Sequence, residues 1–493
     1  MALSTVEREI AHLFRRAGFG ATRADIATWA PKGRAAAVDH LVDYDKVDNS
    51  FVNAEADSID PPNNPDQIAR WWLVRLAHTK RPLEEKMTLF WHDHWACGID
   101  KVERPLTMLE QNKLFRQMAL PNWRAMCEAV AKNPAMLIYL DNYTNRKQAP
   151  NENFAREFCE LHTLGEDVLY KQPDVVAAAR AFTGWSLDFH TDQVRPLETS
   201  RDAELAQPGL TDEQKNQIKR AYYIKIQQVL PTYKYNANQH DEGEKTFLGR
   251  TGNLSGGDVI DVIIARQEAA NLICGKLYNW FVADGPVPSG ALARFTRIYF
   301  DSGYDLKPVV RAILLSDEFW DPRNMRAKTK SPSEYVAGMA RQLEAFTTGQ
   351  SLASSSAALG QTLFFPPNPA GWAGGKAWIN AATILARSNS AATRGSGRAP
   401  AGAPVPGRSY DYWDPMPFIT ASGVTQAGQI VDLFLDLLVD GVATSQERNV
   451  LNEYMHTDDA GSYVDFVLSA NSVDKKVRGL VFLILASPAY HLA

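Results

Sequence analysis

The stretch PDQIARWWLVRLAHTKRPLEEKMTLFWHDHW, residues 65–95, decides the fold class. Large apolar side chains recur at helical spacing in its first part, at Ile68, Trp71, Trp72 and Leu76. Pro82 then stands where a second helix begins, because proline suits the first helical turn. The stretch therefore predicts two consecutive helices.

The same signals extend to both ends of the chain. Ser4 and Glu7 have the spacing of a capping box before a first helix, and Thr22 favours the start of another. Helical spacing also covers residues 106–119, 123–132, 151–164, 174–184, 257 onward, 295–304, 307–316 and 424–492. The predicted fold class is predominantly all-α, with one large multi-helix domain.

A polar segment, residues 190–256, interrupts this pattern. Thr211 and Gln214 predict one helix inside it, whereas the alternation of Tyr222, Ile224 and Ile226 permits short strands. We expect a partly β or irregular insertion that covers a functional site.

These patterns divide the chain of 493 residues into five parts. We expect an N-terminal helical region (1–189), the insertion (190–256), a second helical region (257–387), a flexible loop rich in Gly, Pro and Ser (388–410) and C-terminal helices (411–493).

Composition limits the function classes. A formal net charge of -5 lacks the basic footprint of a nucleic-acid binder, and the pairs Arg15-Arg16 and Lys80-Arg81 are expected to be solvated helix ends. The 4 cysteines form no CxxC pair, which favours buried, reduced thiols. The sequence shows no secretory leader and no membrane span, so we expect a soluble, cytoplasmic protein of unknown oligomeric state.

The first candidate for chemistry is His92-Asp93-His94. Two imidazoles at this spacing point to one face of a strand but diverge by about 200° on a regular helix, where they converge if the chain bends at the helix end. Imidazole binds metals and carries protons near neutral pH. The alternative is a pair of hydrogen-bonded core histidines.

The second candidate is the segment Asn151 to Gly165. Glu157 and Glu160 are three residues apart, and Asn153 and Arg156 are expected on the same face. Buried carboxylates must be paired, protonated or metal-bound. The alternative here is a structural ion-pair network between Arg156 and the glutamates.

The third candidate is the segment His240 to Thr246, HDEGEKT, which offers nitrogen and oxygen ligands in a loop. The alternative is a charge-rich surface loop.

Several motifs, in order, resemble the bacterial family catalogued as domain of unknown function 1800. They are HLFRRAGFG (12–20), EKMTLFWHDH (85–94), the segment 151–165, AFTGW (181–185), the segment 240–249, PPNPAGW (366–372) and the segment 378–387. The resemblance covers nearly the whole chain. It implies no defined chemistry, and it implies that many similar proteins are exported. In the family the position of His162 can be Phe, which disfavours a role for His162.

Two hypotheses follow. In the first, the protein is an enzyme, a hydrolase or an oxidoreductase, whose catalytic residues are His92, His94, Arg156, Glu157, Glu160 and His240. A divalent metal, Zn, Mn or Fe, would be held by His92, His94, Glu157, Glu160 and Asp241. In the second, the cluster is structural and the protein binds a partner, a small molecule or a glycan in Trp-rich grooves. Both require the HxH segment and residues 151–165 to meet in space, and we expect a cavity there with His240 near its mouth.

Overall fold

The computed structural model describes residues 3–166, 168–397 and 411–493. The predominantly all-α fold class is confirmed. The first helices are α1 (Thr5–Arg16), α2 (Arg23–Trp29), α3 (Gly33–Val42), α4 (Ser50–Asp57), α5 (Ile68–His78), α6 (Pro82–His94), α7 (Ile99–Val102), α8 (Pro105–Gln117), α9 (Trp123–Ala131), α10 (Pro134–Tyr139), α11 (Asn153–Glu157) and α12 (Gln172–Ala181).

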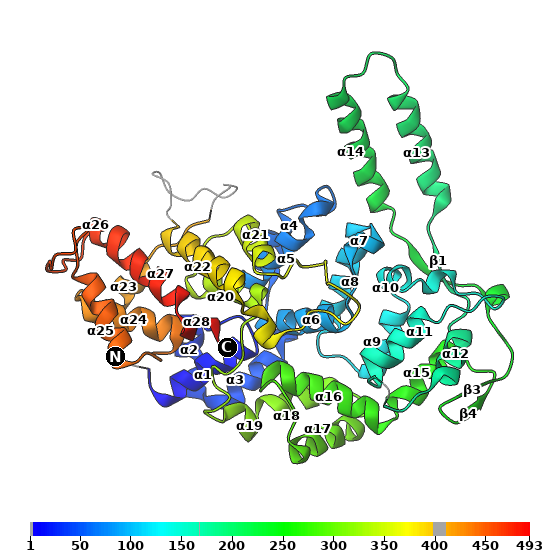
Figure 1. The fold of residues 1–493 in the computed structure, drawn as a ribbon, viewed down its shortest axis with the longest axis horizontal. Coiled ribbons are helices and arrows are strands. Elements are labelled where there is room, and N and C mark those ends of the chain that lie inside the picture. Colours follow the sequence, from blue (N-terminus) through cyan, green and yellow to red (C-terminus); the bar gives the residue numbers. More distant parts are fainter. Residues whose placement is uncertain (1–2, 167, 398–410) are drawn as a thin grey trace.

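The later helices include a projecting pair, α13 and α14, and otherwise belong to the body (Figure 1). They are α13 (Thr191–Leu205), α14 (Asp212–Gln228), α15 (Gly256–Ile264), α16 (Gln267–Phe281), α17 (Ser289–Asp301), α18 (Leu306–Leu314), α19 (Asp317–Trp320), α20 (Pro332–Gln342), α21 (Gln350–Ala358), α22 (Ala381–Ser396), α23 (Met416–Ser422), α24 (Ala427–Val439), α25 (Ser445–Met455), α26 (Ala470–Ser472), α27 (Arg478–Ala486) and α28 (Pro488–His491). None of the described helices is both long enough and apolar enough to cross a bilayer.

The helices are arranged along an elongated body (Figure 1). The C-terminal helices α23–α27 lie at one end, and α9–α12 with α15 lie at the other, with α6 between them. The predicted starts are confirmed: the Ser4–Glu7 capping box precedes α1, Thr22 caps α2 and Pro82 is the first residue of α6. The four cysteines are free and buried.

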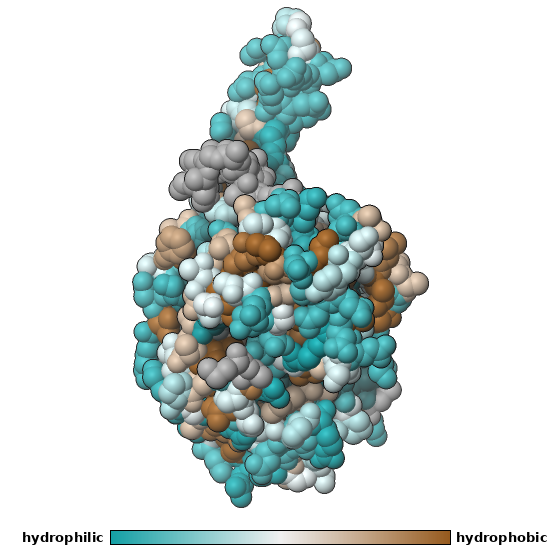
Figure 2. Space-filling model, turned by 90° about the vertical axis from the view of Figure 1, so that its left-hand side faces the viewer, coloured by the Kyte–Doolittle hydropathy of each residue, from teal (hydrophilic) through white to brown (hydrophobic). Residues whose placement is uncertain are grey.

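The insertion, residues 190–256, was expected to be partly β or irregular and to cover a functional site, but much of it is helical and projects outward (Figure 1). Its helices α13 and α14 form an antiparallel hairpin that projects from the body (Figure 1), and its surface is mostly hydrophilic (Figure 2). Tyr222 to Ile226, read as possible strand, lies inside α14, which begins at the predicted Thr211 capping box. Pairing with the neighbouring helix overrides the short alternation.

The named strands of the described chain form two small sheets, one at the base of the hairpin and one beside α12 (Figure 1). β1 (Trp185–Asp188) pairs antiparallel with β2 (Thr232–Tyr235), so that Trp185 lies opposite Tyr235. β3 (Lys245–Phe247) pairs antiparallel with β4 (Arg250–Gly252). The first pair closes the base of the hairpin.

The flexible loop expected over 388–410 is not seen in its first part, because residues 388–396 are helical. Helix α22 continues to Ser396, and its side chains Arg387, Ser390, Ala391 and Arg394 are buried. The helix persists because α27 packs along it. The remainder of that prediction, from residue 398 on, lies outside the described residues.

The pair Arg15-Arg16 is not a solvated helix end, so that expectation is wrong. Both side chains are buried. Arg15 pairs with Asp440, and Arg16 Nη2 donates to the backbone oxygens of Val282 and Asn324, each at 2.7 Å. Residues more than 250 positions away supply these acceptors, so the local sequence could not reveal them.

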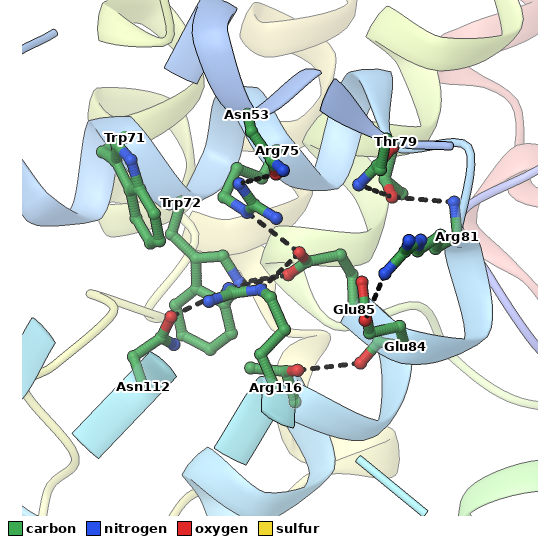
Figure 3. A network of polar contacts seen from close by, with 12 residues as sticks. Asn53, Trp71, Trp72, Arg75, Thr79, Arg81, Glu84, Glu85, Asn112 and Arg116 are labelled. Atoms are coloured by element: carbon green, nitrogen blue, oxygen red, sulfur yellow. Dashed lines mark hydrogen bonds and ion pairs between the residues drawn. The ribbon is translucent and has the colours of Figure 1, made fainter. Parts of the chain in front are cut away.

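A second buried charge network fixes α5, α6 and α8 to one another (Figure 3). The Glu85 carboxylate is fully buried and accepts from Arg75 Nε at 3.0 Å and from Arg116 Nε at 2.6 Å. Trp72 Nε1 donates to the other carboxylate oxygen at 2.9 Å. Burial raises the pKa of Glu85, but the two guanidinium groups outweigh it and hold the pKa at about 2.

Candidate functional site

The HxH segment and the segment 151–165 meet, as predicted. His94, the last residue of α6, places Nε2 at 3.1 Å from the backbone oxygen of His162. His162 places Nδ1 at 2.7 Å from the backbone oxygen of His94. Because a carbonyl oxygen only accepts, each imidazole carries its proton on the nitrogen that faces the other residue. The two segments are therefore joined by a reciprocal pair of hydrogen bonds.

A π-helical segment, Phe158–Thr163, positions His162. It continues α11 with one wider turn, which rotates the residues after Glu157 away from the regular helical register. Segments of this kind occur frequently at functional sites. The sequence disfavoured His162, yet His162 is the residue of this helix that contacts the HxH segment.

His92 points in another direction. Its Nε2 accepts from the backbone N–H of Phe364 at 3.0 Å, and its ring packs against Trp72. Burial lowers the pKa of His92 to about 3, so the imidazole is neutral. The two imidazoles diverge because His92 and His94 are both inside the regular helix α6.

Asp93 lies between the two histidines and is half-buried. Its Oδ1 accepts from the backbone N–H of Trp372 at 2.9 Å. Gly371 has φ +81°, and any side chain there would clash with Asp93. Burial raises the pKa of Asp93 to about 6, against the lowering effects of the Trp372 hydrogen bond and the Lys276 charge. This carboxyl group therefore titrates close to neutral pH.

Lys276, on α16, completes the cluster. Its Nζ donates to Nδ1 of His94 at 3.2 Å and to the backbone oxygen of Leu161 at 3.1 Å. Burial lowers the pKa of Lys276, and the charge of Asp93 opposes this effect. An ammonium group has three N–H donors, so one remains after these two bonds.

Asp93 and Lys276 attract one another without pairing. Across residues 3–166, 168–397 and 411–493 the structure gives no hydrogen bond or ion pair that joins them. Both side chains are half-buried. They are therefore two partly exposed groups of opposite charge that interact electrostatically and are bonded to other partners.

The predicted glutamates make none of the described hydrogen bonds or ion pairs with Asp93, His94 or Lys276. Glu157 is half-buried, and burial together with the charge of Glu160 raises its pKa. Glu160 Oε2 lies 3.3 Å from Tyr170 Oη. Arg156 pairs with Glu152 at 2.9 Å and with Gln172 at 2.8 Å, so the expected network between Arg156 and Glu160 is absent from the described contacts.

His240 and Asp241 belong to a different part of the molecule. His240 is buried, and its Nδ1 lies 2.8 Å from the backbone oxygen of Thr183. Asp241 pairs with Arg180 at 2.6 Å. The His240 side chain and the Asp241 backbone N–H, which donates to Thr183 Oγ1 at 2.8 Å, both bind Thr183. The described contacts of His240 and Asp241 do not include the HxH segment.

The five residues predicted to bind a metal ion, His92, His94, Glu157, Glu160 and Asp241, do not converge on one point. No three His, Cys, Asp or Glu side chains in the described part of the chain are placed to hold a metal ion. His92 Nε2 is already an acceptor for Phe364, and both ring nitrogens of His94 are engaged. The residues as placed therefore do not fit a Zn, Mn or Fe site.

Sequence reasoning missed Lys276 and the role of Asp93. Lys276 is the one basic residue of QEAANLICGKLYNWF, the sequence of α16. A lysine that follows the largely apolar run Leu272–Gly275 indicates that its partly buried ammonium meets a specific partner. The partners themselves lie on α6 and the π-helical segment, more than 100 positions away.

The motifs that meet here also identify the family. The HxH motif, the segment 151–165 and the PPNPAGW motif all contribute contacts to the cluster around Asp93. No curated protein and no solved structure matches the chain. The model of the family described as "Protein of unknown function (DUF1800)" matches residues 12–492. The chain therefore belongs to the DUF1800 family.

Proposed function

We propose that the protein is an enzyme that transfers protons at Asp93 beside the ammonium group of Lys276. The observation that carries this proposal is that these two half-buried groups of opposite charge interact electrostatically without a direct hydrogen bond or ion pair, where three sequence motifs converge. Structural ion pairs in protein interiors are joined directly, as Glu85 is to Arg75 and Arg116. Asp93 and Lys276 are held apart by other partners.

The groups have complementary roles. A carboxyl group that titrates near neutral pH can both donate and accept a proton under working conditions. The remaining N–H of Lys276 is available to an oxygen that gains negative charge in the transition state. His94 holds Lys276 and is itself fixed by His162, so it acts as a positioning residue.

Hydrolysis is the reaction class that this pair suits best. In hydrolysis of an ester or amide, the Asp93 carboxylate would take a proton from the attacking water as the water oxygen bonds to the carbonyl carbon, and the Lys276 ammonium would stabilise the resulting oxyanion. The protonated Asp93 would then give this proton to the leaving alcohol or amine as its bond to the carbonyl carbon breaks. The sequence was compatible with both hydrolysis and oxidation. A proton-transferring carboxyl group beside an ammonium group favours hydrolysis.

The test is a panel of chromogenic ester, amide and glycoside substrates with the full-length protein. Asp93→Asn and Lys276→Met should each lower kcat/KM at least 100-fold, and kcat/KM should change with pH through the Asp93 pKa of about 6. Asp301→Asn, at the exposed end of α17, is the matched control. Turnover that Asp93→Asn leaves intact, or hydrolysis of none of the ester and amide substrates, would overturn the proposal.

Metal dependence is tested separately. We expect a purified, extensively dialysed sample to contain far less than one equivalent of Zn, Mn or Fe, because the described His and carboxylate side chains do not converge. Inductively coupled plasma mass spectrometry measures this directly. One equivalent of metal that is lost in His94→Ala would show that these residues rearrange into the site the sequence suggested.

A further inference from the structure

A polar cavity of about 230 Å³ lies at the base of the α13–α14 hairpin. Its walls come from three chain segments, and the side chains that line it are Tyr143, Asn145, Arg146, Ser186, Asn236 and Gln239. None of these residues belongs to the Asp93 cluster. We propose that this cavity binds a small neutral polyhydroxylated ligand, such as one sugar unit.

Backbone hydrogen bonds hold the three walls together. Gly184 N–H donates to the Asn145 backbone oxygen at 3.1 Å, and Asn236 N–H donates to the Gly184 backbone oxygen at 2.8 Å. Lys147 N–H donates to the Gln239 backbone oxygen at 2.9 Å. The cavity is therefore formed before any ligand arrives, which reduces the ordering cost of binding.

Gly184 allows these walls to approach. It has φ +79°, in the left-handed region, and a Cβ at this position would lie 2.6 Å from the Asn236 backbone oxygen. His240 packs against the same glycine from behind, with Nδ1 held by Thr183. His240 therefore supports the wall of this cavity, which is not the cavity beside the HxH segment at whose mouth the sequence predicted it.

The lining selects the chemistry of the ligand. Amide and hydroxyl groups predominate, and Arg146 is the one charged side chain among the lining residues. Gln239 Oε1 is buried and has no hydrogen-bond donor within the described chain. Ser186 Oγ already donates to the Tyr143 backbone oxygen at 2.9 Å, which leaves it as an acceptor.

These acceptors favour hydroxyl groups over anions. A ligand oxygen without a proton would face the Gln239 and Ser186 oxygens without a hydrogen bond, at a cost. A hydroxyl donates to such acceptors and also accepts from Arg146 or an amide N–H. The volume is below the range of drug-sized pockets, which suits a single ring.

The experiment uses the full-length protein, saturation-transfer NMR and calorimetry. The probes are glucose, galactose, mannose and N-acetylglucosamine, with inorganic phosphate and glucuronate as anionic probes. We expect saturable binding of at least one neutral sugar, weakened at least tenfold by Gln239→Leu. Gln217→Leu, on the exposed face of α14, is the matched control and should bind as the wild type does.

Ser186→Ala is the second variant if Gln239→Leu fails to fold, and it should weaken binding in the same direction. Binding of phosphate or glucuronate alone would overturn the proposal, as would the absence of any sugar binding or equal binding by Gln239→Leu. The Asp93→Asn variant should bind the sugar normally, which separates this proposal from the proposed activity.

Discussion

Asp93 carries a protonation equilibrium that differs between the folded and unfolded chain. Burial raises its pKa from the ordinary value of 3.8 to about 6. Between these values the folded state binds more protons than the unfolded state, so the contribution of Asp93 to stability falls as the pH rises. Above a pH of about 6 the folded protein contains a carboxylate that its surroundings disfavour.

Asp93→Asn should therefore raise the free energy of unfolding at pH 8, because a neutral amide removes this penalty while its oxygen still accepts from Trp372. The gain should shrink as the pH falls through 6 and vanish below about 4. Urea unfolding at pH 8, 6 and 4 measures it. A variant that is both more stable and inactive is the combination expected of a functional residue. Equal destabilisation at all three values would contradict this reading.

Glu85 shows the opposite behaviour of a buried carboxylate. Glu85→Gln should lower the free energy of unfolding by about 3–5 kcal/mol, because Arg75 and Arg116 lose their shared counter-charge in the interior. Chemical denaturation gives the difference. Glu110→Gln removes an exposed pair with Lys113 on α8 and should change stability by less than about 1 kcal/mol. Similar losses in both variants would show that the network does not stabilise the core.

At the scale of elements, the hairpin is the part least coupled to the body. Helix α13 buries none of its residues, and α14 buries only Tyr222 and Gln227. Its contacts to the body include the exposed pair of Arg220 with Asp66 at 2.5 Å. Exposed pairs of this kind contribute little to stability.

Replacing residues 198–223 with a short Gly-Ser linker should therefore leave the melting temperature within about 4 °C of the wild type. The truncated chain retains β1 and β2, which close the base. Differential scanning calorimetry tests this, and far-ultraviolet circular dichroism should show only the helix content removed with the hairpin. A loss of cooperative melting would mean that the hairpin is part of the folding unit.

At the scale of the molecule, buried histidines make the fold sensitive to acid. Burial lowers the pKa of His92 and His162 to about 3, and of His78 and His491 to about 4. A histidine with a lowered pKa stabilises the fold fully above its unfolded value of 6.5, and this contribution is lost as the pH falls. Asp93 and Asp436, with raised pKa values of about 6, act in the opposite direction but are fewer.

The free energy of unfolding should therefore fall between pH 6.5 and pH 5, by up to about 2 kcal/mol for each fully buried histidine. Urea titrations across this range provide the measurement. In His92→Gln, the fall in the free energy of unfolding over this pH range should be smaller by the share of one histidine. The glutamine amide oxygen can still accept from the Phe364 N–H. Stability that is constant from pH 7 to pH 5 would show that these imidazoles are protonated or solvated.

The sequence by itself determined the helices, because helical spacing, capping boxes and an N-terminal proline act over a few neighbouring residues. Ser4 with Glu7, Thr211 with Gln214 and Pro82 each begin a helix where predicted. The sequence also predicted that the HxH segment meets residues 151–165, because buried polar groups in both segments need partners.

Only the tertiary structure decided which groups meet. Arg15 bonds to Asp440, Asp93 to Trp372 and His94 to Lys276, over separations of 425, 279 and 182 residues. The π-helical segment turned His162, rather than Glu157 or Glu160, toward His94. Such pairings depend on how whole helices pack, which no local pattern encodes, and they moved the candidate site from a set of metal ligands to Asp93 and Lys276.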